Sequence, residues 1–234
     1  ATATSSAIGR VLLASLGLDP DAAVVLPAVD STAPPGVVTG DGQVRVSGTG
    51  TAPLAAAHEV VVIARDDGRD VAVTVATSDL DVRVVRGVDP LLGLIEVTGT
   101  AAVSGGPTAV TAWTDAVARA HVAIGHELVG VARTMLAQAR EHALDRVQFG
   151  RPIAMFQAVR HRLAETLVAI ETAEAVLDAA WLDGTPATAA MAKALAGRGA
   201  RTAAKHCQQV LAGIGFTTEH DFHRSFRRVL VLDE

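Results

Sequence analysis

The spacing of apolar residues changes twice along the 234-residue chain, and each change marks a boundary between predicted elements. Near the start, apolar residues between Ile8 and Leu16 recur at steps that suit a helix of about two or three turns. Asp19-Pro20 and then Pro34-Pro35 end this pattern, because proline lacks the N–H that a helix interior needs.

Residues 37–104 show a different pattern, in which short runs of β-branched residues alternate with turns. The runs are residues 43–47, 59–64, 71–76, 80–85 and 94–97. The turns Gly40-Asp41-Gly42 and Asp66-Asp67-Gly68 favour hairpins, because these residue types accept left-handed backbone conformations. The spacing predicts an antiparallel β-domain of roughly 70 residues. It contains neither a G-x-G-x-x-G nor a G-x-x-x-x-G-K motif, so it does not suggest a nucleotide-binding fold.

From residue 105 onward, apolar residues return to steps of three and four, which is the period of a buried helix stripe. The first stripe consists of Val117, Ala120, Ile124, Leu128, Val131 and Met135. It predicts a helix from near Pro107-Thr108 to Arg146, and Pro152 suits the first turn of a second helix over residues 153–181. A third helix over residues 188–211 and a short basic helix complete the pattern.

The predicted fold class is therefore α+β, with an antiparallel β-domain followed by an up-and-down four-helix bundle. Three segments follow from the pattern: residues 1–36 with one short helix, the β-domain at 37–104, and the bundle at 105–234. Long helices with short connections favour antiparallel neighbours, which is the arrangement of an up-and-down bundle.

The amino-acid composition argues against several classes of function. Half of the residues are hydrophobic but only 3% are aromatic, so the core must be built from Ala, Val and Leu. The net charge is −5 without a block of basic residues, which argues against a nucleic-acid surface. Cys207 is the sole cysteine, so no disulfide forms within the chain and the composition suits a reducing cytoplasm. No apolar run approaches the roughly 20 residues of a membrane span, and residues 1–9 lack a signal-peptide pattern.

Two motifs in the helical region carry more information. Residues 146–153 read Arg-Val-Gln-Phe-Gly-Arg-Pro-Ile and are followed by Phe156-Gln157. Residues 209–216 read Gln-Val-Leu-Ala-Gly-Ile-Gly-Phe and are followed by Glu219 and Arg227. Together with Ala180-Trp181 and Asp183-Gly184 between them, they resemble the C-terminal helical domain of the acyl-CoA dehydrogenases. That family has Arg-x-x-Phe-Gly before a helix bearing a Gln, and later Gln-x-x-Gly-Gly-x-Gly-Phe-x-x-Glu; here Ala212 replaces the first Gly of the pair.

The resemblance implies a flavin adenine dinucleotide (FAD) site that is shared between subunits. By resemblance, the cofactor-binding residues are Arg146, Phe149, Gln157, Gln209 and Gly213. An Arg beside a Gly turn suits a pyrophosphate, Gln suits ribose or adenine edges, and Phe offers a stacking face. The alternative is purely structural: Phe149 and Phe156 would pack the bundle, and Arg146 would be a solvated charge at a helix end.

Other segments depart from the family pattern. The resemblance extends to residues 37–104 as the middle β-domain and to residues 1–36 as a remnant of the N-terminal helical domain. The family binds the flavin ring through Thr-Glu-Pro and Gly-Ser-Asp before the β-domain and through Trp-x-Thr/Ser inside it. Here those positions hold residues 33–36, Ala-Pro-Pro-Gly, and residues 50–52, Gly-Thr-Ala. Neither segment matches.

The catalytic base of the family is not assigned to any residue here. Most members place a Glu on the loop after the final Arg, which by counting falls just past Glu234. A smaller group places it on the first bundle helix, where this chain has Ala120. Glu127 is expected to be a buried or interface acid, and His126 a structural residue.

With these departures, the chain resembles a subgroup of actinobacterial acyl-CoA dehydrogenases. Members of that subgroup act on steroid side-chain CoA thioesters as heterotetramers of two unlike subunits. The hypothesis is a subunit that contributes half of an FAD site and an oligomer interface, while a partner supplies the base and the acyl pocket. Two alternatives stay open: a self-sufficient dehydrogenase seen as a truncated chain, and a scaffold that has lost the cofactor. A metal site at His220, Asp221 and His223 is not expected, because these residues match a family ending.

Overall fold

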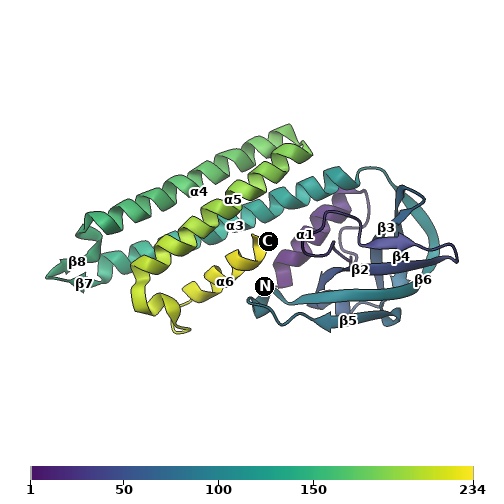
Figure 1. The fold of residues 1–234 in the computed structure, drawn as a ribbon, viewed down its shortest axis with the longest axis horizontal. Coiled ribbons are helices and arrows are strands. Elements are labelled where there is room, and N and C mark those ends of the chain that lie inside the picture. Colours follow the sequence, from purple (N-terminus) through teal and green to yellow (C-terminus); the bar gives the residue numbers. More distant parts are fainter. Residues whose placement is uncertain (1, 234) are drawn as a thin grey trace. The chain divides into compact units, whose positions relative to one another are not determined.

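A computed structural model describes residues 2–233, with side chains from residue 7 onward. The chain divides into two compact units, Ala1–Ala120 and His121–Glu234, and the boundary falls within helix α3 (Trp113–Asp145). Each unit is described by itself (Figure 1). Over the described residues, none of the helices is both long and apolar enough to cross a membrane.

The first unit is built around strands that close into a ring. The ring strands are β1 (Gly36–Val38), β2 (Gln43–Thr51), β3 (Glu59–Asp66), β4 (Arg69–Ala76) and β6 (Leu94–Val110). They pair in the order β2-β1-β3-β4-β6, and β6 pairs with β2 again, so the ring formed by these strands has no open edge. β5 (Leu80–Val84) adds to β6. All of these pairs are antiparallel except β1 with β3.

The strands form because β-branched residues alternate with polar ones, and the buried set faces the inside of the ring. In β2, for example, Val44 and Val46 are buried while Arg45 is exposed. The buried cluster is made of Val25, Val44, Val46, Leu54, Val60, Val62, Ala64, Val71, Val73, Val75, Leu80, Ile95, Val97 and Ala101. Asp67 (φ 42°) and Gly68 (φ 80°) form the predicted left-handed turn between β3 and β4.

A second cluster lies on the outside of the strands, where helices cover them. α1 (Thr2–Ser15) and the start of α3 contribute Leu12, Trp113 and Ala116, which pack with Ile63 and Val110. The Trp113 indole N–H donates to the Thr32 carbonyl oxygen at 2.8 Å. This bond satisfies the polar edge of a nearly buried ring.

β6 extends further than the sequence pattern indicates. Residues 104–110 pair with β4, for example Thr108 with Ala72 and Val110 with Asp70, and α3 begins only at Trp113. The predicted helix start near Pro107-Thr108 is therefore wrong. Residues rich in Gly, Ser and Thr show no strand alternation, but the otherwise unpaired edge of β4 supplies their hydrogen bonds.

The second unit consists of antiparallel helices, which confirms the predicted bundle. After α3 come α4 (Gln157–Asp183), α5 (Pro186–Leu211) and α6 (Phe222–Leu232). Thr185 caps α5 by accepting the Thr188 N–H at 3.3 Å, and Gly184 (φ 67°) ends α4. Small residues dominate the buried face of α5: Ala189, Ala192, Ala196, Gly197, Gly199, Ala200, Ala203 and Ala204. A side chain at Gly199 would lie 3.1 Å from the Ala169 carbonyl oxygen of α4, so the two helices approach closely.

α6 is fixed to the other helices at two points. Near its middle, Arg228 donates to Glu127 of α3 at 2.9 Å, and their side chains are only 14% and 16% exposed. Glu127, predicted to be a buried or interface acid, is thus mostly buried and paired within this unit. After the last turn, the Lys193 ammonium donates to the Asp233 carbonyl oxygen at 2.6 Å, and Arg201 pairs with the Asp233 carboxylate.

The close approach at Gly48 gives a test of the first unit. A Cβ at Gly48 would overlap the Leu26 carbonyl oxygen and lie 2.7 Å from a Val25 methyl group. Gly48→Ala should therefore lower the free energy of unfolding by about 1–3 kcal/mol, the usual cost of overpacking. Gly40→Ala is the matched control, because a methyl group at that position would meet no atom within 4 Å. Urea unfolding that shows equal stability for both variants would contradict this packing.

Candidate functional site

The five residues expected to bind a cofactor all lie in the second unit, at the connections between its helices. Arg146 directly follows α3, and Gln157 is the first residue of α4. Between them, Phe149 lies in the hairpin of β7 (Val147–Gln148) and β8 (Arg151–Pro152), which Figure 1 shows at one tip of the bundle. Gln209 lies in the last turn of α5, and Gly213 lies in the 3₁₀ segment η4 (Ala212–Phe216).

One contact and one connection place these residues at the same end of the bundle. Thr166 of α4 meets His206 of α5, with 3.2 Å between Oγ1 and Nδ1, so the first half of α4 lies beside the second half of α5. The β7–β8 hairpin joins the end of α3 to the start of α4. The structure therefore brings the five predicted residues to one end of this unit.

The hairpin holds the motif residues in a tight turn. Phe149 (φ 53°) and Gly150 (φ 76°) are both left-handed, as a two-residue type I′ turn requires. Val147 pairs with Pro152, and the Ile153 N–H donates to the Arg146 carbonyl oxygen at 2.8 Å. Pro152 thus belongs to the hairpin, and α4 begins at Gln157 rather than in the predicted first turn at Pro152. A left-handed Phe costs roughly 1–2 kcal/mol, which the surrounding ladder has to offset.

Phe149 projects into solvent instead of packing the bundle. Its side chain is 92% exposed, and its ring meets the edge of Phe156 with 6.1 Å between centroids. The Arg151 guanidinium stacks over the face of Phe156 at 4.5 Å from the ring centroid. Core packing therefore does not account for Phe149, although it does contribute to the half-buried Phe156.

The polar members of the set are available to a ligand. Arg146, Gln157 and Gln209 are exposed, and none of them forms a side-chain hydrogen bond or ion pair with another residue in the described range 2–233. The Arg146 charge nevertheless acts locally. The pKa of His142 is lowered by burial first and then by the nearby Arg146 and His220 charges. Burial and the Arg146 charge therefore both disfavour the protonated form of the His142 imidazole.

The end of α5 has an unusual backbone. Ala212 adopts φ 53° and ψ −133°, a conformation close to the first central position of a type II′ turn, which glycine prefers. The family motif has its first Gly at this position, and a glycine would adopt the same conformation without strain. Next to it, Gly213 is exposed and faces open space, with no atom within 4 Å of a Cβ position.

Apolar side chains surround this end of the unit without cover. The exposed set comprises Leu144, Val147, Phe149, Met155, Ile214 and Phe216. Phe216 is 73% exposed and Met155 is 58% exposed. Apolar groups gathered around polar ones that have no partner within the described chain are typical of a surface that another molecule covers.

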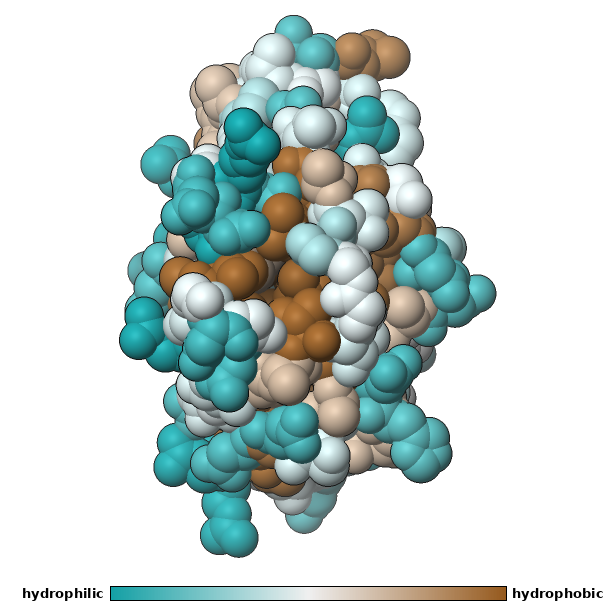
Figure 2. Space-filling view, turned by 90° about the vertical axis from the view of Figure 1, so that its right-hand side faces the viewer, coloured by the Kyte–Doolittle hydropathy of each residue, from teal (hydrophilic) through white to brown (hydrophobic). Residues whose placement is uncertain are grey.

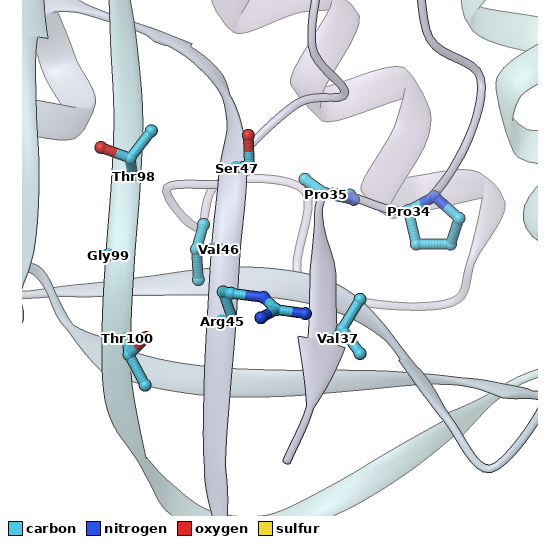
Figure 3. A pocket seen from close by; sticks show the side chains of 9 residues that line it. All are labelled: Pro34, Pro35, Val37, Arg45, Val46, Ser47, Thr98, Gly99 and Thr100. Carbon is cyan, nitrogen blue, oxygen red and sulfur yellow. The ribbon is translucent and has the colours of Figure 1, made fainter.

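The first unit contains an open hollow of about 440 Å³ on the outer face of the strands (Figure 3). Arg45 and Ser47 of β2 and Thr98 of β6 line it, and Pro34 and Pro35 form its wall. Figure 2, viewed from the side where Figure 1 draws the strands, shows apolar residues gathered among hydrophilic ones. The two prolines offer no hydrogen-bond donor where the family has Thr, Ser and acidic groups.

Other residues considered as a nucleophile, metal ligand or catalytic base do not form a second site among the described residues. Burial raises the pKa of the Cys207 thiol to about 12, so this cysteine is not a nucleophile. The Phe222 N–H donates to His220 Nδ1 at 3.1 Å, and His223 Nδ1 lies 2.8 Å from the His220 carbonyl oxygen. Ala120 is buried, and Glu234 lies outside the described residues.

Comparison with known proteins matches residues 109–233 to the acyl-CoA dehydrogenase C-terminal domain. Over 109 residues the chain is 42% identical to acyl-CoA dehydrogenase IpdE2 of Mycobacterium tuberculosis, covering 47% of this chain and 34% of that protein. Over 195 residues it is 37% identical to acyl-CoA dehydrogenase FadE34 of the same organism, covering 78% of this chain and 26% of that protein. The chain therefore spans about a third or less of the length of these curated relatives.

A solved structure is also similar over almost the whole chain. The ChsE4-ChsE5 complex from Mycobacterium tuberculosis matches with a TM-score of 0.78 at 25% identity, covering 98% of this chain and 70% of that chain. This likeness includes the closed β-unit as well as the helical unit, and it confirms the predicted α+β fold class.

The strained backbone at Ala212 generates the first prediction for this site. Ala212→Gly should raise the free energy of unfolding by about 1 kcal/mol, because relief of backbone strain outweighs the added freedom of the unfolded chain. Ala194→Gly, at an exposed position inside α5, is the control and should cost about 1 kcal/mol. Thermal unfolding in which Ala212→Gly destabilises as much as Ala194→Gly would contradict the assigned conformation.

The second prediction concerns pH. Because the folded-state pKa of His142 lies below its ordinary 6.5, the unfolded chain binds a proton that the folded chain does not. His142 therefore leaves the free energy of unfolding unchanged well above pH 6.5. The free energy of unfolding falls as the pH drops from 6.5 towards the lower pKa of the folded state. His142→Gln should flatten the loss of unfolding free energy between about pH 7 and pH 5. His161→Gln, which removes an exposed imidazole from α4, is the control; an equal change in both variants would refute the role of His142.

Proposed function

The chain belongs to the acyl-CoA dehydrogenase family, and from that premise we propose that it is one subunit of a heteromeric, FAD-dependent acyl-CoA dehydrogenase. It offers a half-site at one end of its helical unit to a flavin seated mainly in a partner subunit. The reaction of the complex is the α,β-desaturation of an acyl-CoA thioester. The resemblance of residues 213–228 to the steroid subgroup favours a steroid side-chain CoA as the substrate.

The observation that carries the proposal is the composition of that end. A guanidinium and two carboxamides without partners in residues 2–233 converge there with an exposed phenyl ring and an open glycine. These groups fit FAD, because the cofactor presents a charged pyrophosphate, hydroxyl and ring edges, and flat π-faces. A solvated surface without a ligand has no comparable reason to expose Phe149 at 92%.

Each residue has a specific binding role in this proposal. Arg146 neutralises the pyrophosphate, and Gln157 and Gln209 bind the ribose or adenine edges through amide groups that donate and accept. Phe149 covers a flat face of the cofactor and excludes water, and Gly213 lets the backbone approach closely. When bound, FAD accepts a hydride from the β carbon of the thioester while a base removes the α proton. None of these five side chains is a proton acceptor for that step.

Two further observations support division of the site between unlike subunits. The segments at residues 33–36 and 50–52 do not match the motifs with which the family holds its flavin ring. Ala120 occupies one of the family's base positions, and an alanine cannot accept a proton. The similar structure is a complex of two differently named chains, ChsE4 and ChsE5, which accords with a partner that supplies the base and acyl pocket.

Removal of the Arg146 guanidinium tests the half-site. In the complex with its partner, Arg146→Ala should raise the dissociation constant for FAD about 10–100-fold, because a charge-assisted hydrogen bond contributes about 1.5–3 kcal/mol. The measurement is flavin fluorescence during titration of the deflavinated complex. The fold of this chain should be unchanged, since Arg146 forms no side-chain hydrogen bond or ion pair within residues 2–233, and the two chains should still co-purify.

Arg140→Ala serves as the matched control, because it removes an equally exposed arginine from α3. Unchanged FAD affinity in Arg146→Ala would support the scaffold alternative and refute the half-site. Equal losses in both variants would indicate a general effect of charge rather than contact with the cofactor.

A further inference from the structure

The register of the β7–β8 hairpin puts a second arginine on the same face as Arg146. Gln148 pairs with Arg151, and opposite residues of an antiparallel pair project to the same face. The ladder continues through the hydrogen bond from the Ile153 N–H to the Arg146 carbonyl oxygen. Because side chains alternate along a strand, Arg146 lies on the face of Gln148 and therefore of Arg151.

The position of Arg151 is fixed by its stack on Phe156. Its guanidinium carbon lies 4.5 Å from the ring centroid, and the same ring is met from the side by Phe149. Stacking leaves the edge N–H groups of a guanidinium free to donate in the plane. The cation is thus held in place without its hydrogen-bonding capacity being used.

Two exposed cations on one hairpin face repel each other, and a bound anion would favour the pair. Diagonal positions of a ladder are roughly 7–8 Å apart, a distance that one diphosphate could span. Residues 146–156 contain no Asp or Glu, and Arg151 forms no ion pair within residues 2–233. Asp145 is the nearest acid along the chain, and it belongs to the last turn of α3. The face therefore lacks a counter-charge within the hairpin itself.

We propose that Arg151 is a second phosphate-binding cation of the half-site, and that the Arg146–Arg151 pair selects a ligand with a diphosphate over one with a single phosphate. Each guanidinium would hold one phosphoryl group, and the amide of Gln148, which pairs with Arg151, would supply a further hydrogen-bond donor on the same face. This inference rests on the proposed function, because it assigns the residue that distinguishes FAD from FMN at the same site.

The test compares FAD with FMN in the deflavinated complex. Arg151→Gln should weaken FAD about tenfold, since loss of one charged hydrogen bond contributes about 1.5 kcal/mol, and should leave FMN within about twofold. Arg151→Lys should retain most of the preference, because it keeps the charge. Arg160→Gln removes an exposed arginine of α4 as the control, and it should change neither affinity.

A second measurement uses a fragment without the flavin ring. AMP carries the adenosine-side phosphate, which FMN lacks, so Arg151→Gln should weaken the competition of AMP with FAD about tenfold. Equal losses of FAD and FMN affinity in Arg151→Gln, with the competition by AMP unchanged, would show that Arg151 only positions the hairpin and would overturn the inference. If Arg146→Ala weakens FAD while Arg151→Gln does not, the inference fails and the proposed function stands. If neither variant changes FAD affinity, both fail.

Discussion

The close contact between α4 and α5 determines where every residue of the candidate site lies. Alanines and glycines on the buried face of α5 allow the two helices to approach until Gly199 nearly touches the Ala169 carbonyl oxygen. The short connection at Gly184-Thr185 makes the two helices antiparallel neighbours. The start of α4 and the end of α5 are therefore adjacent, and Gln157 and Gln209, more than fifty positions apart in sequence, lie at the same end.

That end differs from the rest of the unit because it contains strained backbone and exposed apolar side chains. The core is apolar and its acid, Glu127, is paired with Arg228. At the end, by contrast, Phe149 and Ala212 are held in left-handed backbone conformations, and aromatic and aliphatic side chains are exposed. Strained and exposed groups lower the stability of a chain by itself, and they persist where the surrounding structure or a bound ligand offsets the cost. The proposed half-site, which a cofactor and a second subunit would complete, would account for both the strained backbone and the exposed apolar side chains.

The sequence predicted the elements whose patterns are local and regular. The helices predicted over residues 153–181 and 188–211 are observed over 157–183 and 186–211. The valine-rich strands and the turn at Asp67-Gly68 follow from periodicity and turn chemistry, and the motif residues were identified by resemblance. Residues 104–110 could not be predicted as a strand, because their pairing depends on the free edge of β4 and not on their own composition. The Glu127–Arg228 pair joins residues 101 positions apart, and nothing local indicates it. The left-handed conformation of Ala212 was hidden because alanine is an ordinary residue in a helix.

The central claim is that this chain completes a flavin site and does not build one alone. The most direct test is the flavin content of the chain expressed by itself and of the chain co-expressed with its partner, measured from visible absorbance after size-exclusion chromatography. The account predicts an almost colourless chain alone and a yellow complex with one FAD for each pair of unlike subunits. A stable yellow homo-oligomer of this chain alone would contradict it.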